Sequence, residues 1–210
     1  MREAADNLTV QRRTIVIAIA ATIPVALLVW LALRFLLPDI PGMEQPVSRL
    51  GFALGAVAIA VLLALLPGVE AVAHERLVTP AIDPLAGYET ERMRVNLRYL
   101  QNTLEQTMVF AAGLLPLAWY CADGSAMRAV VATTVVWILA RWAFWIGYHR
   151  SPLLRGLGAA GMLQSLLVLL YVAYRFGSAY GGMAGGLAPV VAFLGIEALL
   201  FAVTARPSTR

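Results

Sequence analysis

The chain has 210 residues, of which 60% are hydrophobic, and its mean hydropathy is +0.77. These values are typical of integral membrane proteins, and no polar stretch is long enough to fold into a separate water-soluble domain. The single cysteine excludes an internal disulfide, the two histidines match no zinc-site spacing, and the net charge of +4 speaks to membrane orientation rather than to a nucleic-acid partner.

Hydropathy predicts an all-α protein with six membrane-spanning helices. The first follows Arg12 and Arg13, as a signal peptide would, but its apolar run is too long and no cleavage site follows. We therefore interpret it as a retained signal anchor. Pro67-Gly68 predicts a bend near the end of the second span. The six spans are expected over residues 14–37, 49–73, 95–120, 127–148, 157–176 and 187–204.

The connections carry their own signals. Residues 78–88, with two prolines and a glycine, are expected to be irregular. Asp123-Gly124-Ser125 predicts a tight turn, so the third and fourth spans should be antiparallel neighbours. Residues 177–186 are glycine-rich and are expected to form a flexible loop, and the pair Gly51 and Gly55 predicts a close helix approach.

Arginine counts predict the orientation, because positively charged loops stay in the cytoplasm. With six spans, both termini lie on one side. The opposite side holds only Arg34, Arg49, Arg128 and Arg175. We therefore expect a protein of the inner (plasma) membrane with both termini in the cytoplasm. The cytoplasmic side would hold the remaining loop and terminal arginines, which are Arg2, Arg12, Arg13, Arg76, Arg92, Arg94, Arg98, Arg150, Arg155, Arg206 and Arg210.

A polar row heads the third span. Offsets of 0, 4 and 7 put Arg98, Asn102 and Glu105 on one helix face. Ionisable groups at membrane depth are costly and usually mark a functional site. The alternative is a hydrogen-bonded seam between helices, in which an arginine neutralises Glu105.

A second polar cluster ends the fourth span. Arg141, Phe144 and Tyr148 share a face at offsets 0, 3 and 7, and Arg155 opens the fifth span. The predicted topology returns this cluster to the cytoplasmic leaflet that holds Arg98. Arg141 has a second interpretation as the partner of Glu105, and Tyr148 as an interfacial belt residue.

The two clusters together resemble the signatures of the MAPEG superfamily, the membrane-associated proteins in eicosanoid and glutathione metabolism. Residues 98–105 resemble its R-x-x-x-N-x-x-E motif, and residues 141–155 are similar to its arginine, tyrosine and arginine spaced by seven. The resemblance covers residues 46–176 and implies a MAPEG-like four-helix bundle core that forms trimers. Residues 1–45 and 177–210 would each add one extra transmembrane helix.

The resemblance also implies a site. Arg98, Asn102 and Glu105 would hold glutathione as a cosubstrate, and Arg141 and Tyr148 would contribute from the facing helix. Arg155 would be catalytic, with Tyr148, by stabilising the glutathione thiolate. No metal is implied. Gly156 stands where some members carry serine, so a serine-assisted mechanism is not expected.

The resulting functional hypothesis is a membrane glutathione transferase or peroxidase. The partners would be glutathione or a similar thiol, a lipophilic small molecule, membrane lipid and two further copies of the chain, without nucleic acid. The alternative is a non-catalytic lipid-binding or scaffold protein of the same fold, because one branch of the family acts without turning over glutathione. A transporter is disfavoured because no inverted repeat is present.

Overall fold

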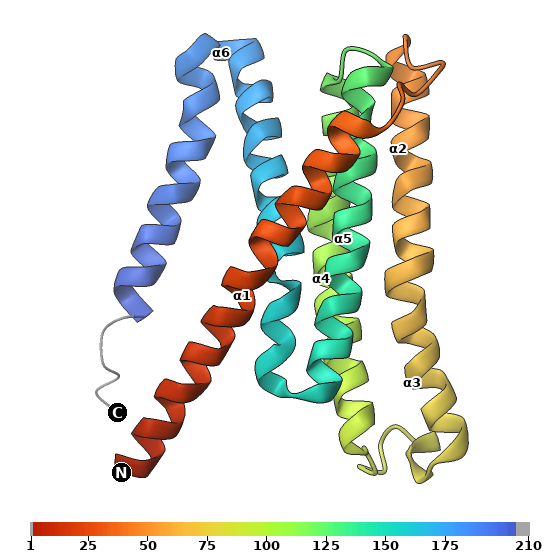
Figure 1. The fold of residues 1–210 in the computed structure, drawn as a ribbon, viewed down its shortest axis with the longest axis vertical. Coiled ribbons are helices and arrows are strands. Elements are labelled where there is room, and N and C mark those ends of the chain that lie inside the picture. Colours follow the sequence, from red (N-terminus) through yellow and green to blue (C-terminus); the bar gives the residue numbers. More distant parts are fainter. Residues whose placement is uncertain (1, 205–210) are drawn as a thin grey trace. The chain divides into compact units, whose positions relative to one another are not determined.

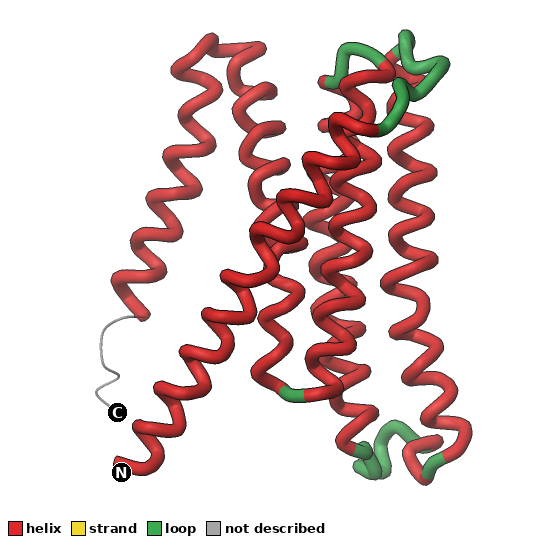
Figure 2. Tube along the Cα trace, viewed as in Figure 1, coloured by secondary structure: helices red, strands yellow, loops and turns green. Residues whose placement is uncertain are grey.

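The computed structural model describes the backbone of residues 2–204 and the side chains of residues 10–151 and 153–204. Every regular element in this part of the chain is a helix, as predicted (Figures 1 and 2). The chain forms two compact units, of which the first ends at Leu166 and the second begins at Leu167. The elements are α1 (Arg2–Leu36), α2 (Pro46–Ala60), the π-helix η1 (Val61–Leu65), α3 (Leu66–Val78), the 3₁₀ helix η2 (Pro80–Ile82), α4 (Glu91–Tyr120), α5 (Gly124–Arg150), the 3₁₀ helix η3 (Pro152–Gly158) and α6 (Ala159–Thr204).

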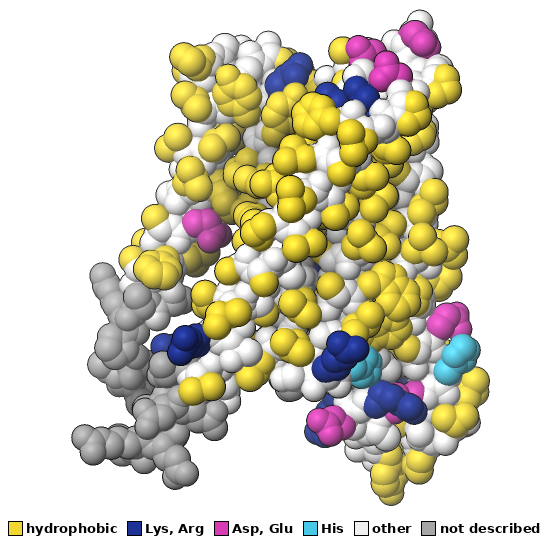
Figure 3. All heavy atoms as spheres, viewed as in Figure 1, with side chains coloured by type: hydrophobic (Ala, Val, Ile, Leu, Met, Phe, Trp, Pro, Cys, Tyr) yellow, Lys and Arg dark blue, Asp and Glu magenta, His cyan; other side chains and the backbone are white. Residues whose placement is uncertain are grey.

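The chain is a multi-pass membrane protein with four candidate spans among its described residues. They are Val10–Leu36, Pro46–Val78, Gly124–Arg150 and Leu153–Thr204. The third expected span corresponds to α4, whose charged and amide side chains lower its hydropathy below that of the other helices. On the face of the first unit seen in Figure 3, charged side chains gather at the two ends and the surface between them is largely apolar.

The expected bend at Pro67 is a π-helical turn that joins α2 to α3 in one continuous helix. Within it the Leu66 amide donates to the Val61 carbonyl, five residues back. Pro67 has no amide proton, so the Leu63 carbonyl has no donor at the usual position. The indole of Trp142 on α5 donates to that carbonyl at 2.9 Å. A side chain from another helix therefore satisfies the backbone that proline leaves open, as apolar surroundings require.

Tyr99 on α4 completes this junction. Its hydroxyl donates to the Ala64 carbonyl at 2.6 Å, and its ring is fully buried. The ring lies against Gly68, where an added Cβ would be 2.8 Å from two ring carbons. On its other side the ring stacks on Trp145, with centroids 4.5 Å apart. Gly68 is therefore required by the close approach of Tyr99.

The opposite end of the first unit is tied by two arginines. Arg49 is 6% exposed and donates from Nη1 to three carbonyls, those of Met43, Glu44 and Ala122. Arg128 donates to the Leu37 carbonyl at 2.7 Å. These bonds hold the α1–α2 and α4–α5 connections together. Among the other arginines counted for orientation, Arg206, Arg210 and the side chain of Arg2 lie outside the described residues.

The predicted tight turn is present, and α4 and α5 pack as antiparallel neighbours (Figure 1). The Asp123 carboxylate accepts from the Ala126 amide at 2.8 Å and so caps α5. The close approach expected at Gly51 and Gly55 is not found among the described residues of the chain. No atom would lie within 4 Å of a Cβ at either position.

Helix α1 packs on α5 and η3. The Trp30 indole donates to Thr133 Oγ1 at 3.1 Å. A Cβ at Gly156 would lie 3.1 Å from the Ile15 carbonyl oxygen and 3.3 Å from Ala18 Cβ. Helix α1 therefore leaves little room for a side chain at position 156, where the sequence has glycine instead of the serine noted above.

In the second unit, the expected glycine-rich loop is almost entirely helical. Non-helical backbone is confined to Gly181 and Gly182, and Gly182 has a positive φ of 58°. A residue with positive φ can reverse the direction of the chain, and glycine adopts positive φ without steric cost. A Cβ at Gly177 would lie only 2.1 Å from the Gly185 carbonyl oxygen, so glycine also allows the two arms to approach closely.

Replacing Gly68 by alanine should destabilise the protein. The new methyl group would meet the Tyr99 ring at 2.8 Å, and that ring is held by its stack and its hydrogen bond. Overpacking of this kind costs about 1–3 kcal/mol, more than the roughly 1 kcal/mol that alanine contributes to a helix interior. The melting temperature in detergent should fall.

The matched control is Gly195→Ala on α6. No atom lies within 4 Å of a Cβ at that position, so its melting temperature should stay the same or rise. Equal melting temperatures for the two variants would contradict the packing argument.

Candidate functional site

The polar row predicted on α4 lies on the exposed surface of the first unit. Gln101 joins its two charged members, because Arg98 donates to the Gln101 amide oxygen and the Gln101 amide nitrogen donates to Glu105, both at 3.3 Å. All three side chains are exposed. A shallow hollow of about 270 Å³ adjoins the row and is lined by Glu89, Arg94, Leu97, Arg98 and Gln101. The row therefore presents a guanidinium, an amide and a carboxylate side by side.

Asn102 belongs to the same row but turns toward α5. Its Oδ1 accepts from Arg141 Nη1 at 2.7 Å, which joins the two predicted clusters directly. Arg141 is 2% exposed and also donates to the Gly158 carbonyl at 3.0 Å. The alternative pairing of Arg141 with Glu105 is wrong, since Glu105 bonds Gln101 instead.

The packing around Arg141 explains how its guanidinium is held. Its Cζ lies 5.2 Å from the centroid of the Phe144 ring. Gly158 leaves the necessary space, because a Cβ there would come within 3.0 Å of Arg141 Nη2. Arg141 therefore acts inside the chain as the anchor of Asn102, and its guanidinium does not face solvent.

Tyr148 and Arg155 lie at the end of α5 and on η3. The Tyr148 ring is half-buried and contacts Phe144, with centroids 5.7 Å apart. Arg155 is exposed. A Cβ at Gly147 would lie 2.6 Å from the Leu154 carbonyl oxygen, so η3 lies directly on α5. The predicted shared face of Arg141, Phe144 and Tyr148 is confirmed by these ring contacts.

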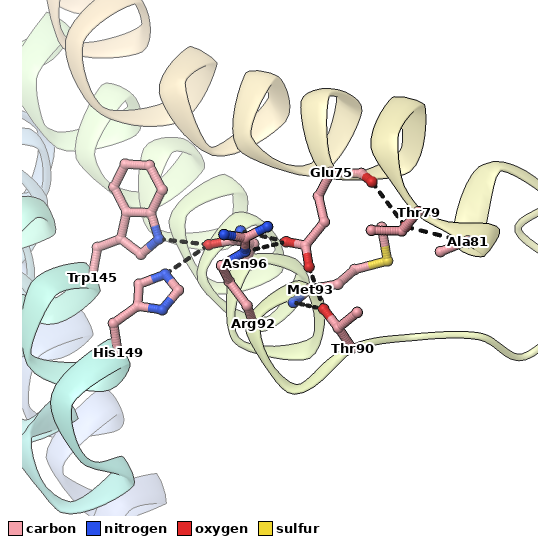
Figure 4. A network of polar contacts seen from close by, with 9 residues as sticks. All are labelled: Glu75, Thr79, Ala81, Thr90, Arg92, Met93, Asn96, Trp145 and His149. Carbon is pink, nitrogen blue, oxygen red and sulfur yellow. Dashed lines mark hydrogen bonds and ion pairs between the residues drawn. The ribbon is translucent and has the colours of Figure 1, made fainter.

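Sequence reasoning missed a second polar network at this end of the bundle (Figure 4). Its centre is Glu75 on α3, which is 3% exposed. The carboxylate accepts from Arg92 Nε at 3.1 Å, from Asn96 Nδ2 at 3.5 Å and from the Thr90 hydroxyl. A buried carboxylate is tolerated only with such partners.

Asn96 extends the network to α5. Its Oδ1 accepts from Trp145 Nε1 at 2.9 Å and lies 2.8 Å from His149 Nε2. A signal for this network was available, because Arg92, Asn96 and Tyr99 repeat the offsets 0, 4 and 7 of the exposed row. Arg92 precedes Arg98 by six residues, which corresponds to a rotation of about 240° around the helix axis. The second row therefore lies on another face of α4 than the exposed row. Nothing in the sequence pairs it with Glu75 or His149.

The two rows give α4 two kinds of polar surface. The inner row is bonded to α3 and α5, whereas Arg98, Gln101 and Glu105 bond only to one another among the described residues. Exposed charged groups of both signs suit a zwitterionic ligand, because arginine pairs with carboxylates and a carboxylate pairs with an ammonium group. The described residues contain no group of three or more His, Cys, Asp or Glu placed to hold a metal ion.

Comparison with known proteins identifies the family. Searches of curated proteins and of solved structures found no significant match. The model of the MAPEG family matches residues 50–175, which include the exposed row, Arg141, Tyr148 and Arg155. This match covers more than half of the chain, and the chain therefore belongs to the MAPEG family.

Proposed function

We propose that the protein is a glutathione-dependent membrane transferase or peroxidase that conjugates or reduces apolar electrophiles. The MAPEG family includes such enzymes. The observation that carries the proposal is the exposed row Arg98–Gln101–Glu105, with Asn102 anchored beside it by Arg141. The site is built on one rigid helix, which is how a ligand is held in a defined pose.

The charges of the row match those of glutathione, which carries two carboxylates and one ammonium group. Arg98 offers a planar, permanently charged guanidinium to a carboxylate. Asn102 offers its amide nitrogen to a peptide carbonyl or carboxylate, since its oxygen is occupied by Arg141. Glu105 binds the ammonium group. In this arrangement Arg141 contributes by fixing Asn102, and Tyr148 contributes from the facing helix α5.

The chemistry assigned to Arg155 is stabilisation of the thiolate. A guanidinium beside a thiol favours its ionised form, which is the nucleophile. The thiolate sulfur then bonds to the electrophilic carbon, and the leaving group departs with its electron pair. In the peroxidase reaction two thiols reduce one hydroperoxide to an alcohol and water, and the glutathione disulfide forms.

We propose further that the active form is a homotrimer with six spans per chain, in the inner membrane with both termini cytoplasmic. The inner row of α4 bonds to α3 and α5 of the same chain, whereas the exposed row has no such partner among the described residues. A second copy of the chain would therefore complete the site. The arginine asymmetry supports the orientation. Arg49 and Arg128, on the sparsely charged side, already bond to backbone carbonyls.

The alternative is a non-catalytic lipid-binding or scaffold protein of the same fold. Its support is the amount of apolar surface on α1, α2 and α6, where many large side chains are exposed. The exposed row and the anchored Asn102 favour the enzyme, because a lipid-binding surface does not need a zwitterion-binding row.

Glutathione binding to the detergent-solubilised protein tests the proposal by calorimetry. Arg98→Ala and Glu105→Gln should each weaken binding by about ten- to a hundredfold, the effect of one charge-assisted hydrogen bond. Assembly should be largely intact, because each variant changes one side chain of the row and leaves the apolar helix surfaces as they are.

The controls for these variants remove the same charges elsewhere. Arg13→Ala on α1 and Glu70→Gln on α3 alter exposed residues outside the row and should bind like the parent protein. Normal binding by Arg98→Ala and Glu105→Gln, together with loss of the oligomer, would favour a structural seam.

The assembly is tested by native mass measurement in mild detergent. Three copies should be found, since the exposed row requires a facing surface. A monomer at concentrations that support glutathione binding would contradict the shared site.

Arg155→Met should act on the thiol more than on binding. Turnover of an apolar aryl chloride should fall, with a smaller change in apparent glutathione affinity, and should recover partly as the pH rises toward the thiol pKa of about 8.5–9. Ultraviolet thiolate absorbance titrated from pH 6 to pH 10 is the measurement. Arg150→Met, an exposed arginine at the end of α5, is the matched control, and titration curves identical to the parent for both variants would remove Arg155 from the mechanism.

A further inference from the structure

The orientation of the Asn96 amide is determined by two partners, of which one can only donate and the other can only accept a hydrogen bond. The Trp145 indole is a donor only, so the atom 2.9 Å from it is the amide oxygen. The Glu75 carboxylate is an acceptor, so the atom 3.5 Å from it is the amide nitrogen. Both ends of the amide give the same orientation.

This orientation determines which nitrogen of His149 carries the proton. His149 Nε2 lies 2.8 Å from Asn96 Oδ1, which can only accept, so Nε2 must be the donor. In the neutral imidazole the other nitrogen, Nδ1, is then an unprotonated acceptor. Figure 4 shows Nδ1 on the side of the ring away from Asn96. His149 is an exposed residue.

The geometry is that of an oriented general base. In cysteine–histidine–asparagine sites, an amide holds one nitrogen of the imidazole and the other takes the proton of a thiol. Here the holding amide is itself held from both sides, by Glu75 and Trp145. Asn96 is buried and anchored in the helix bundle, so the ring has a defined direction.

A series of ring contacts leads from His149 to Tyr148, which the proposed function assigns to the glutathione site. The His149 ring is 6.2 Å from that of Trp145, which stacks on Tyr99 at 4.5 Å. Tyr99 stacks in turn on Phe144 at 6.0 Å, and Phe144 contacts Tyr148 at 5.7 Å. One continuous set of aromatic contacts therefore joins the base to Tyr148, the residue next to it in sequence.

We propose that His149 Nδ1 is the general base that deprotonates the thiol substrate, with Asn96 as its positioning residue. The inference rests on the proposed glutathione-dependent function and adds the group that takes the proton. The S–H bond breaks, its electron pair stays on sulfur, and the proton forms an imidazolium. The thiolate attacks the electrophilic carbon, the leaving group departs with its electron pair, and the imidazolium returns its proton to water.

The charges around the imidazole fit this cycle. Glu75 on α3 and Arg92 on α4 form an ion pair next to Asn96, and both interact electrostatically with the ring. Arg150 follows on α5, and Arg155 lies on η3, which packs against α5. Arg92 disfavours the imidazolium and the Glu75 carboxylate favours it, while Arg155 stabilises the thiolate. The two product charges of the proton transfer thus have separate partners.

The test compares His149→Gln and His149→Ala with the parent protein and with His74→Gln. His74 is the matched control because it is the only other histidine and is exposed on α3, 3.4 Å from Glu70. Glutathione binding is measured by calorimetry, and kcat/KM for conjugation of an aryl chloride is measured from pH 5.5 to pH 9. Imidazole is then added to the His149→Ala protein.

Both His149 variants should bind glutathione within about twofold of the parent protein. At pH 7 their kcat/KM should be about a hundredfold lower, the range of a general base. The deficit should narrow as the pH rises, because hydroxide then deprotonates the thiol. Added imidazole should restore part of the rate to His149→Ala, in proportion to its concentration, and none to His74→Gln or the parent.

Three results would overturn the inference. Parent-like kcat/KM in both His149 variants would exclude the base while leaving the proposed function intact. A deficit that neither imidazole nor high pH relieves would show that His149 acts on structure alone. If the parent protein itself does not bind glutathione, the proposed function is overturned, and the inference with it. If His149→Gln does not fold, His149→Asn is measured in its place.

Discussion

Polar groups buried between packed helices must find partners, and α4 is the helix on which this constraint acts most strongly. Its inner row is bonded to the neighbouring helices, with Asn96 joining Glu75 on α3 to Trp145 on α5. Its outer row stays exposed. The bundle is therefore arranged around α4 so that one polar face is consumed in holding three helices together and the other remains available to a ligand.

The proline in the second span is part of the same arrangement. Pro67 frees a backbone carbonyl, and Trp142 and Tyr99 bring donors to the carbonyls of Leu63 and Ala64. Tyr99 also stacks on Trp145. The aromatic side chains that satisfy the bent backbone are thus in contact with those that orient Asn96. A change that straightens the bend would therefore disturb the contacts around Asn96.

The other end of the first unit shows that arginines in a membrane protein have two distinct uses. Arg49 and Arg128 bond to backbone carbonyls of the connecting loops and hold the α4–α5 turn in place. Arg98 and Arg155 are exposed, and Arg98 donates to the neighbouring Gln101. Arg49 is buried and Arg128 is partly buried, so these two arginines hold the fold together as well as counting toward the asymmetry that predicts orientation.

The sequence alone determined the helical class, the antiparallel pair α4 and α5, and the outer polar row of α4, because helical period and apolar length depend only on local residue order. It did not determine how helices rotate against one another. Offsets place Arg98, Asn102 and Glu105 on one face, yet only the packing of α5 decides that Arg141 meets Asn102 and not Glu105.

Only the tertiary structure decided which residues Asn96 bonds to on the other helices. Glu75 lies 21 residues before Asn96, and His149 lies 53 residues after it, so no period of the sequence relates them. The glycine-rich segment shows the same limit on a local scale. Its composition predicts a loop, but a single residue with positive φ, Gly182, reverses the chain. Hydrogen bonding then favours helix on both sides, because extending a formed helix costs little compared with starting one.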